Sequence, residues 1–129
     1  MTLTSWKNGK SLAWDYTCHD TLAASYLHLS SQAAGKVAEK ADNDKYNKYQ
    51  ELTEDFIVMP VANETFGPWC PDSLDFIKDI GSRITAANGD KRVTSYLFQS
   101  ISMTVQKGNV DSIRGCIPNT KTLTELFYL

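Results

Sequence analysis

A run rich in aromatic and small apolar side chains lies near the start of the chain, from about residue 11 to residue 18. It follows the dipeptide Asn8-Gly9, whose two residues tolerate positive φ angles and therefore favour a tight hairpin turn. A shorter run of mixed polar and apolar residues precedes that turn. The pattern predicts a β-hairpin in which a first strand over Thr2–Trp6 pairs with a second strand over Ser11–Cys18.

A helical pattern of apolar positions begins after residue 31. Apolar side chains recur mostly at intervals of three and four residues over the next twenty positions, and proline is absent from that stretch. The spacing predicts one long amphipathic helix over most of Ala33–Leu52. The side chains expected to face the sheet are Ala34, Val37, Ala38 and Tyr49 or Leu52.

Three further elements are expected downstream. Phe56–Ala62 is a nearly continuous apolar run bounded by polar residues, which is typical of a buried strand. A helix capped at Asp72-Ser73 carries apolar residues at helical spacing and ends near Asn88, and another helix covers about Thr94–Val105. The predicted fold is a small α/β domain, in which the hairpin and a third strand form a small mixed sheet flanked by about three helices.

Length, composition and charge narrow the class of protein. The 129 residues are 42% hydrophobic and 22% charged, which suits one soluble globular domain with its own core. The net charge of −2 is an argument against strong stand-alone binding to nucleic acid, because phosphate neutralisation needs surplus Lys and Arg. Three widely spaced cysteines favour reduced thiols, and no apolar run approaches a membrane span. An intracellular protein, nuclear or cytoplasmic, is expected.

Asp15 is the first residue that can carry chemistry. It lies near the end of the predicted second strand, between Trp14 and Tyr16. A carboxylate at that place is either a solvated strand-end residue or an oxygen ligand for a hard cation such as Mg²⁺. The spacing alone favours the solvated residue.

Lys45, Lys48 and Tyr49 fall on one face of the predicted long helix. A lysine there can stabilise negative charge that develops on a phosphate, and a tyrosine can position the phosphate. The alternative, which the residues alone favour, is a solvated basic stretch with a tyrosine packed on the core. Glu64 follows the third strand and is either a second metal ligand or a polar residue in a turn.

Three blocks of sequence, taken in order, resemble one known family. They are Leu12–Ala23, the motif Lys45-x-x-Lys48-Tyr49 followed by Glu51-Leu52, and the motif Pro60-Val61-x-x-Glu64-Thr65-x-Gly67. Together they resemble the restriction-enzyme-like endonuclease domain of non-LTR retrotransposon reverse-transcriptase polyproteins, which is similar to the PD-(D/E)XK nucleases. The similar stretch covers residues 1–115, which leaves residues 116–129 as a C-terminal extension.

The resemblance implies an activity and a set of site residues. Intact relatives are expected to hydrolyse DNA phosphodiesters with Mg²⁺, next to an upstream reverse transcriptase. The match assigns Asp15 to the metal and points to Lys45 or Lys48 as the catalytic lysine. Tyr49 is expected to position the phosphate, and Glu64 to assist as a second metal ligand. It predicts that the Asp15 carboxylate lies within one ligand's reach of the helix face that carries the two lysines and the tyrosine.

The chain departs from the family pattern at one of its acids. The Pro-Asp pair expected before Asp15 is absent. Thr17 stands where PD-(D/E)XK nucleases usually carry a lysine, which in this family is expected to come from the following helix. In relatives the pair falls just upstream of the residue aligned with Met1, so the resemblance implies an N-terminally truncated domain that is weakly active or inactive and binds DNA weakly alone. The alternatives are a non-catalytic interaction module with the same fold and an unrelated small α/β protein. Basic charge around Asp15 would favour a nuclease, and an exposed apolar patch would favour an interaction module.

Overall fold

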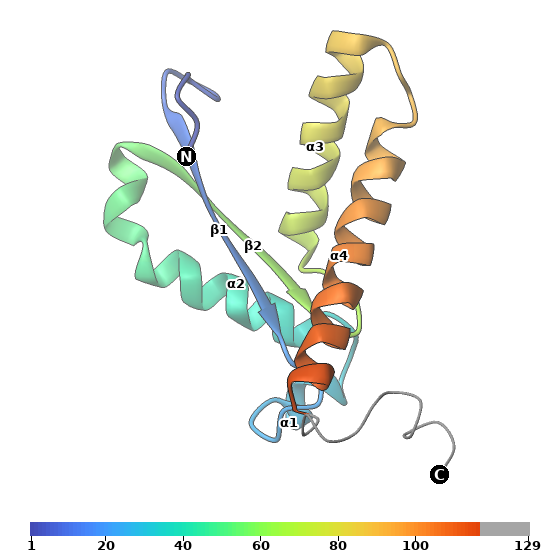
Figure 1. The fold of residues 1–129 in the computed structure, drawn as a ribbon. Helices are drawn as coiled ribbons and strands as arrows, with labels where there is room; N and C mark the ends of the chain where they lie inside the picture. Colours follow the sequence, from blue (N-terminus) through green and yellow to red (C-terminus); the bar gives the residue numbers. More distant parts are fainter. Residues whose placement is uncertain (117–129) are drawn as a thin grey trace.

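Two parallel strands lie at the centre of the molecule, between α2 on one side and the pair α3 and α4 on the other (Figure 1). The structure is a computed structural model, and it describes residues 1–116. The strands are β1 (Ser11–His19) and β2 (Phe56–Glu64), in a register that places Asp15 beside Pro60. The helices are α1 (Leu27–Ser30), α2 (Lys36–Lys48), α3 (Pro71–Asn88) and α4 (Val93–Gly115), with a short 3-10 helix, η1, over Gln50–Glu54.

The sheet differs from the predicted mixed sheet. The Asn8-Gly9 turn forms, with φ angles of 51° and 78°, and Trp6 N donates a 2.8 Å hydrogen bond to Lys10 O. The strand expected over Thr2–Trp6 is wrong, because only an isolated bridge at residues 7 and 10 forms there. Leu3 is 98% exposed and Trp6 alone of the large side chains of this segment packs against the core, which is too little burial to hold a full strand. The predicted Ser11–Cys18 strand is confirmed, but β1 pairs in parallel with β2.

Side-chain alternation divides the apolar core between the two faces of the sheet. On the α3 and α4 face, Leu12 and Val61 are buried against Phe76 and Ile77 of α3. On the α2 face the buried cluster consists of Ala38, Ala41, Ala62 and Cys70. The small residues on the second face let α2 approach the strands closely.

The helix predicted over Ala33–Leu52 is shorter than expected. Gly35 has a φ of 85°, which separates Ala34 from α2, and a Cβ there would lie 3.0 Å from the backbone oxygen of Trp69. The helix ends at Lys48, and η1 follows. Val37 and Ala38 are buried, which confirms the core-facing prediction for them. Ala34 is exposed, so the prediction is wrong for that residue. Of the two alternatives Tyr49 and Leu52, Tyr49 faces the sheet, where its hydroxyl bonds to Asp15, and Leu52 is exposed.

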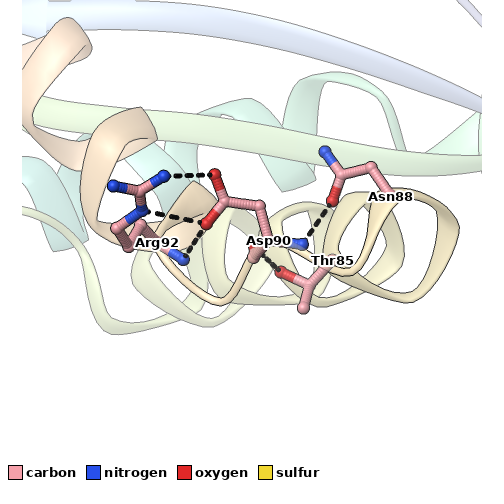
Figure 2. Close-up of polar contacts among 4 residues, drawn as sticks. All are labelled: Thr85, Asn88, Asp90 and Arg92. Atoms are coloured by element: carbon pink, nitrogen blue, oxygen red, sulfur yellow. Dashed lines mark hydrogen bonds and ion pairs between the residues drawn. The ribbon is translucent and has the colours of Figure 1, made fainter.

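A compact polar turn joins α3 to α4 (Figure 2). The Asp90 carboxylate accepts hydrogen bonds from the backbone N–H and the guanidinium of Arg92, which lowers the pKa of Asp90. Thr85 Oγ1 donates to Asp90 O, and Asn88 Oδ1 accepts from Asp90 N. The turn reverses the chain so that α4, which is longer than the predicted Thr94–Val105 helix, packs along α3.

The start of α3 supplies hydrogen-bond partners to the edge of β2 that faces away from β1. Pro71 is the first residue of the helix, and Ser73 is fully buried rather than part of an exposed cap. Ser73 Oγ accepts a 2.8 Å hydrogen bond from Ala62 N, and Cys70 N donates to Ala62 O. Pro60 has no N–H and lies on this same outer edge by strand alternation, so it costs the β1–β2 ladder no hydrogen bond.

Two expectations concern parts of the chain beyond this core. The predicted C-terminal extension, residues 116–129, lies outside the described residues apart from Cys116. Among residues 1–116, no helix is both long and apolar enough to cross a membrane.

Candidate functional site

Three side chains meet on the α2 face of the sheet. Asp15 lies in the middle of β1, so its predicted position near the strand end is wrong. Its Oδ2 accepts hydrogen bonds from Lys45 Nζ at 2.6 Å and from Tyr49 OH at 2.8 Å. The Asp15 side chain is 33% exposed and that of Lys45 is 26% exposed, so solvent reaches the group. The predicted convergence of Asp15 with this helix face is therefore confirmed.

Local structure explains why the three groups converge. Odd-numbered residues of β1 point toward α2, and Asp15 is one of them. Lys45 occupies the last turn of α2, and Tyr49 is its C-terminal cap residue with φ −104° and ψ 16°. The four-residue interval between Lys45 and Tyr49 places both side chains on one helix face. The C-terminal end of α2 thus places the Lys45 ammonium and the Tyr49 hydroxyl beside the same oxygen of Asp15.

The electrostatics of the cluster follow from these contacts. Hydrogen bonds from Lys45 and Tyr49 lower the pKa of Asp15, and the positive charges of Lys45 and Lys48 lower it further. The Asp15 carboxylate raises the pKa of Lys45 in return. The pair is therefore fully ionised at neutral pH.

Lys48 is the second cation of the site. Its Nζ lies 5.1 Å from the centre of the Tyr49 ring, and Lys45 Nζ lies 5.8 Å from the same centre. Both distances are within the range of a cation–π contact. The tyrosine ring therefore lies close to two ammonium groups, which suits an anion with several oxygens.

Glu64 lies at the other end of α2 and does not join this cluster. It is fully buried, and its Oε1 accepts hydrogen bonds from Val37 N at 3.2 Å and Ala38 N at 3.5 Å. Asp15 and Glu64 lie four strand positions apart in the paired register, which corresponds to roughly 13 Å. The expectation that Asp15 and Glu64 share one metal is not supported by this arrangement. Glu64 instead caps the first turn of α2, whose own cap residue, Gly35, has no side chain to do so.

The residues around Asp15 do not fit a resident Mg²⁺ ion. Such a site usually combines one or two carboxylates with substrate oxygens and water. Here Asp15 stands without a second acid, and Lys45 already occupies its Oδ2. Over residues 1–116, no group of three or more His, Cys, Asp or Glu side chains is placed to hold a metal ion.

Asp42 is a chemically unusual residue that the sequence reasoning missed. It lies on the buried side of α2 and is 3% exposed, and its Oδ1 has no hydrogen-bond partner among the described residues. Burial and the nearby charge of Asp72 raise its pKa to about 6. Its position on the apolar face, next to Ala41 and four residues after Ala38, was the available signal.

The opposite face of the sheet carries an apolar groove of about 470 Å³. Trp14 and Tyr16 form part of its wall and are 51% and 46% exposed. The other side chains that line it are mostly large and apolar, among them Trp6, Trp69 and Ile101. The molecule thus has a charged cluster on one face of β1 and exposed aromatic surface on the other.

Comparisons with protein-family models, with curated proteins and with solved structures find no match to this chain.

Proposed function

We propose that this protein is an endonuclease-like domain of the retroelement type and that its Asp15–Lys45–Tyr49 cluster engages a DNA phosphodiester. The observation that carries the proposal is the convergence itself. Lys45 Nζ and Tyr49 OH come from residues about thirty positions after Asp15 in the sequence. Both donate a hydrogen bond to the same oxygen of the Asp15 carboxylate, at 2.6 and 2.8 Å. The resemblance in sequence assigns a role in phosphodiester chemistry to each of these residues.

The cluster offers the groups that a phosphate needs. Lys45 and Lys48 supply two ammonium groups, and Tyr49 supplies a hydroxyl donor, all on one exposed corner of α2. Asp15 holds Lys45 and Tyr49 in a fixed geometry before the anion arrives. Preorganised donors of this kind stabilise charge without rearranging during a reaction.

Cleavage by the single chain is expected to be feeble. The single carboxylate of the cluster already pairs with a lysine, so Mg²⁺ must compete with Lys45 for it. The chain also carries a net charge of −2, which weakens its attraction to DNA. Binding of DNA at this corner is therefore expected to be easier to detect than hydrolysis.

A plasmid-nicking assay with Mg²⁺ or Mn²⁺ tests the activity. The chain should nick supercoiled plasmid slowly, and Asp15→Ala and Lys45→Met should abolish that nicking. Lys40→Met is the matched control, because Lys40 is also an α2 lysine paired with an acid, Asp44, but lies outside the cluster. Absence of nicking at every metal concentration would remove the catalytic part of the proposal. Fast nicking that depends on Asp15 would show that one carboxylate suffices.

A second candidate function is a non-catalytic interaction module. It is favoured by the exposed aromatic residues Trp14 and Tyr16 beside the apolar groove. Exposed apolar patches on small proteins often mark sites of association. Absence of nicking by the unmodified chain, together with binding of a protein partner that Trp14→Ala abolishes, would favour this alternative.

A further inference from the structure

One edge of β1 has unused backbone hydrogen-bonding groups. Leu12 N and Leu12 O bond to Thr2, on the side of β1 away from β2. Strand residues alternate in direction, so the N–H and C=O groups of Trp14, Tyr16 and Cys18 point to that same side. Within residues 1–116 no backbone or side-chain partner meets the groups of these three residues. The edge is therefore a template for a further strand.

The side chains of the same residues give this edge an exposed apolar surface that favours association. Trp14 and Tyr16 are about half exposed, and Cys18 is exposed. An edge strand that is exposed, apolar and free of positive charge at its outward-facing positions lacks the usual protection against pairing. Asp15 is the only Asp, Glu, Lys or Arg residue of β1, and Lys45 neutralises its charge.

We propose that the free edge of β1 binds β1 of a second copy of this chain, in antiparallel orientation, to form a continuous four-stranded sheet. The two-fold axis passes through Tyr16, so that Tyr16 faces Tyr16 of the second copy and Trp14 faces its Cys18. This register uses the three residues with free backbone groups in both copies. Three such pairs, each exchanging two hydrogen bonds, close the edge.

Two features of the chain disfavour a register shifted toward the N-terminal end of β1. Thr2 already occupies the edge at Leu12, and in the proposed register the second copy's β1 ends at His19 before it would reach that position. Asp15 lies opposite Thr17 of the second copy. A shift of the axis to Asp15 would place two carboxylates directly opposite each other and push the strand end into Thr2, both of which are unfavourable.

The dimer brings the two Asp15 side chains together on the α2 face. They are diagonal neighbours across the new strand pair, and diagonal neighbours lie about 7–8 Å apart. The second copy thus supplies the acidic residue that the single chain lacks beside its own Asp15. This consequence rests on the proposed function, whereas the strand pairing does not.

Analytical ultracentrifugation of the full chain over about a hundredfold range of concentration tests the pairing. A monomer–dimer equilibrium is expected. Trp14→Lys should shift it to monomer, because a lysine at an edge opposes strand addition. Tyr16→Pro should do the same by removing one edge N–H, and Tyr16→Phe should leave the dimer unchanged. A monomer at every concentration overturns the proposal, as does a dimer that neither Trp14→Lys nor Tyr16→Pro weakens.

Disulfide trapping tests the register by a measurement that does not depend on the strength of association. Tyr16→Cys is made in a chain with Cys18→Ser and Cys116→Ser, which leaves Cys70 buried. Residues that face each other across a hydrogen-bonded antiparallel pair lie about 5.5 Å apart at Cα, within disulfide range. A cross-linked dimer is expected on mild oxidation. Tyr96→Cys, at an exposed site on α4, is the control for random collisions, and equal cross-linking in both variants contradicts the register.

Discussion

The two ends of α2 meet two carboxylates of the same sheet face, and the two encounters differ in kind. At the C-terminal end, Asp15 is a third exposed and binds the side chains of Lys45 and Tyr49. At the N-terminal end, Glu64 is fully buried and binds backbone N–H groups. Both acids were assigned to the same metal by the resemblance, yet about four strand positions separate them.

The contrast shows how position on a helix decides what a carboxylate does. The N-terminus of a helix exposes unpaired N–H groups and a partial positive charge, so an acid there satisfies backbone donors and stabilises the fold. The C-terminal turn of α2 instead carries basic side chains that reach past the helix end. An acid that meets them remains open to solvent and to a ligand. Glu64 is therefore structural, and Asp15 is the candidate for function.

The largest loss of stability is expected from Glu64→Ala. It leaves Val37 N and Ala38 N buried without an acceptor and should lower the free energy of unfolding by about 3 kcal/mol. Glu64→Gln retains an acceptor for these N–H groups, so a smaller loss of about 1 kcal/mol is expected. Urea denaturation measures both. Glu39→Ala, on the same helix, serves as the control, and a similar loss there would contradict the structural role of Glu64.

Asp42→Asn should stabilise the protein, in a manner that depends on pH. Burial raises the pKa of Asp42 to about 6, above its value in the unfolded chain. The folded state therefore holds the proton more tightly, and the stability that this provides is present below about pH 4 and lost as pH rises through 6. The substitution should add on the order of 2–3 kcal/mol at pH 8 and little at pH 4. Denaturation curves at the two pH values check this, and an equal effect at both would contradict it.

The smallest effect on stability is expected in the exposed cluster. Lys45→Met and Asp15→Asn should leave the free energy of unfolding nearly unchanged, because solvent screens a partly exposed ion pair. The pKa of Asp15 is lowered, so whatever the pair contributes is present at neutral pH and lost as pH falls below about 4. Urea denaturation at pH 7 measures this. A large loss of stability in either variant would mean that the cluster, like Glu64, serves mainly to stabilise the fold.

Strand β1 shows what the sequence could and could not predict. Its run of aromatic and small apolar residues marked the strand to within one residue, and Asn8-Gly9 marked the turn before it. The partner was wrong because turn chemistry is local. Parallel pairing with β2 depends on burial across the length of α2, which no short stretch of sequence displays.

For the candidate site, too, some positions could be predicted from the sequence and others could not. The joint position of Asp15, Lys45 and Tyr49 was predicted, because the helical spacing places two of them on one face and the resemblance named the third. The position of Glu64 was not predicted, since its partners are backbone N–H groups that every residue possesses. Its role follows from the end of β2 meeting the start of α2, which is a property of the fold.

The most direct test of the account is a nuclear magnetic resonance titration of the isotope-labelled chain with a short DNA duplex. Chemical shifts should change most at Lys45, Lys48 and Tyr49, and little at Val37 and Ala38, where Glu64 caps the other end of the helix. Lys45→Met should weaken binding about tenfold relative to Lys40→Met, and added salt should weaken it in both. Shifts confined to other surfaces, or equal affinity of the two variants, would contradict the assignment of this corner as a phosphodiester site.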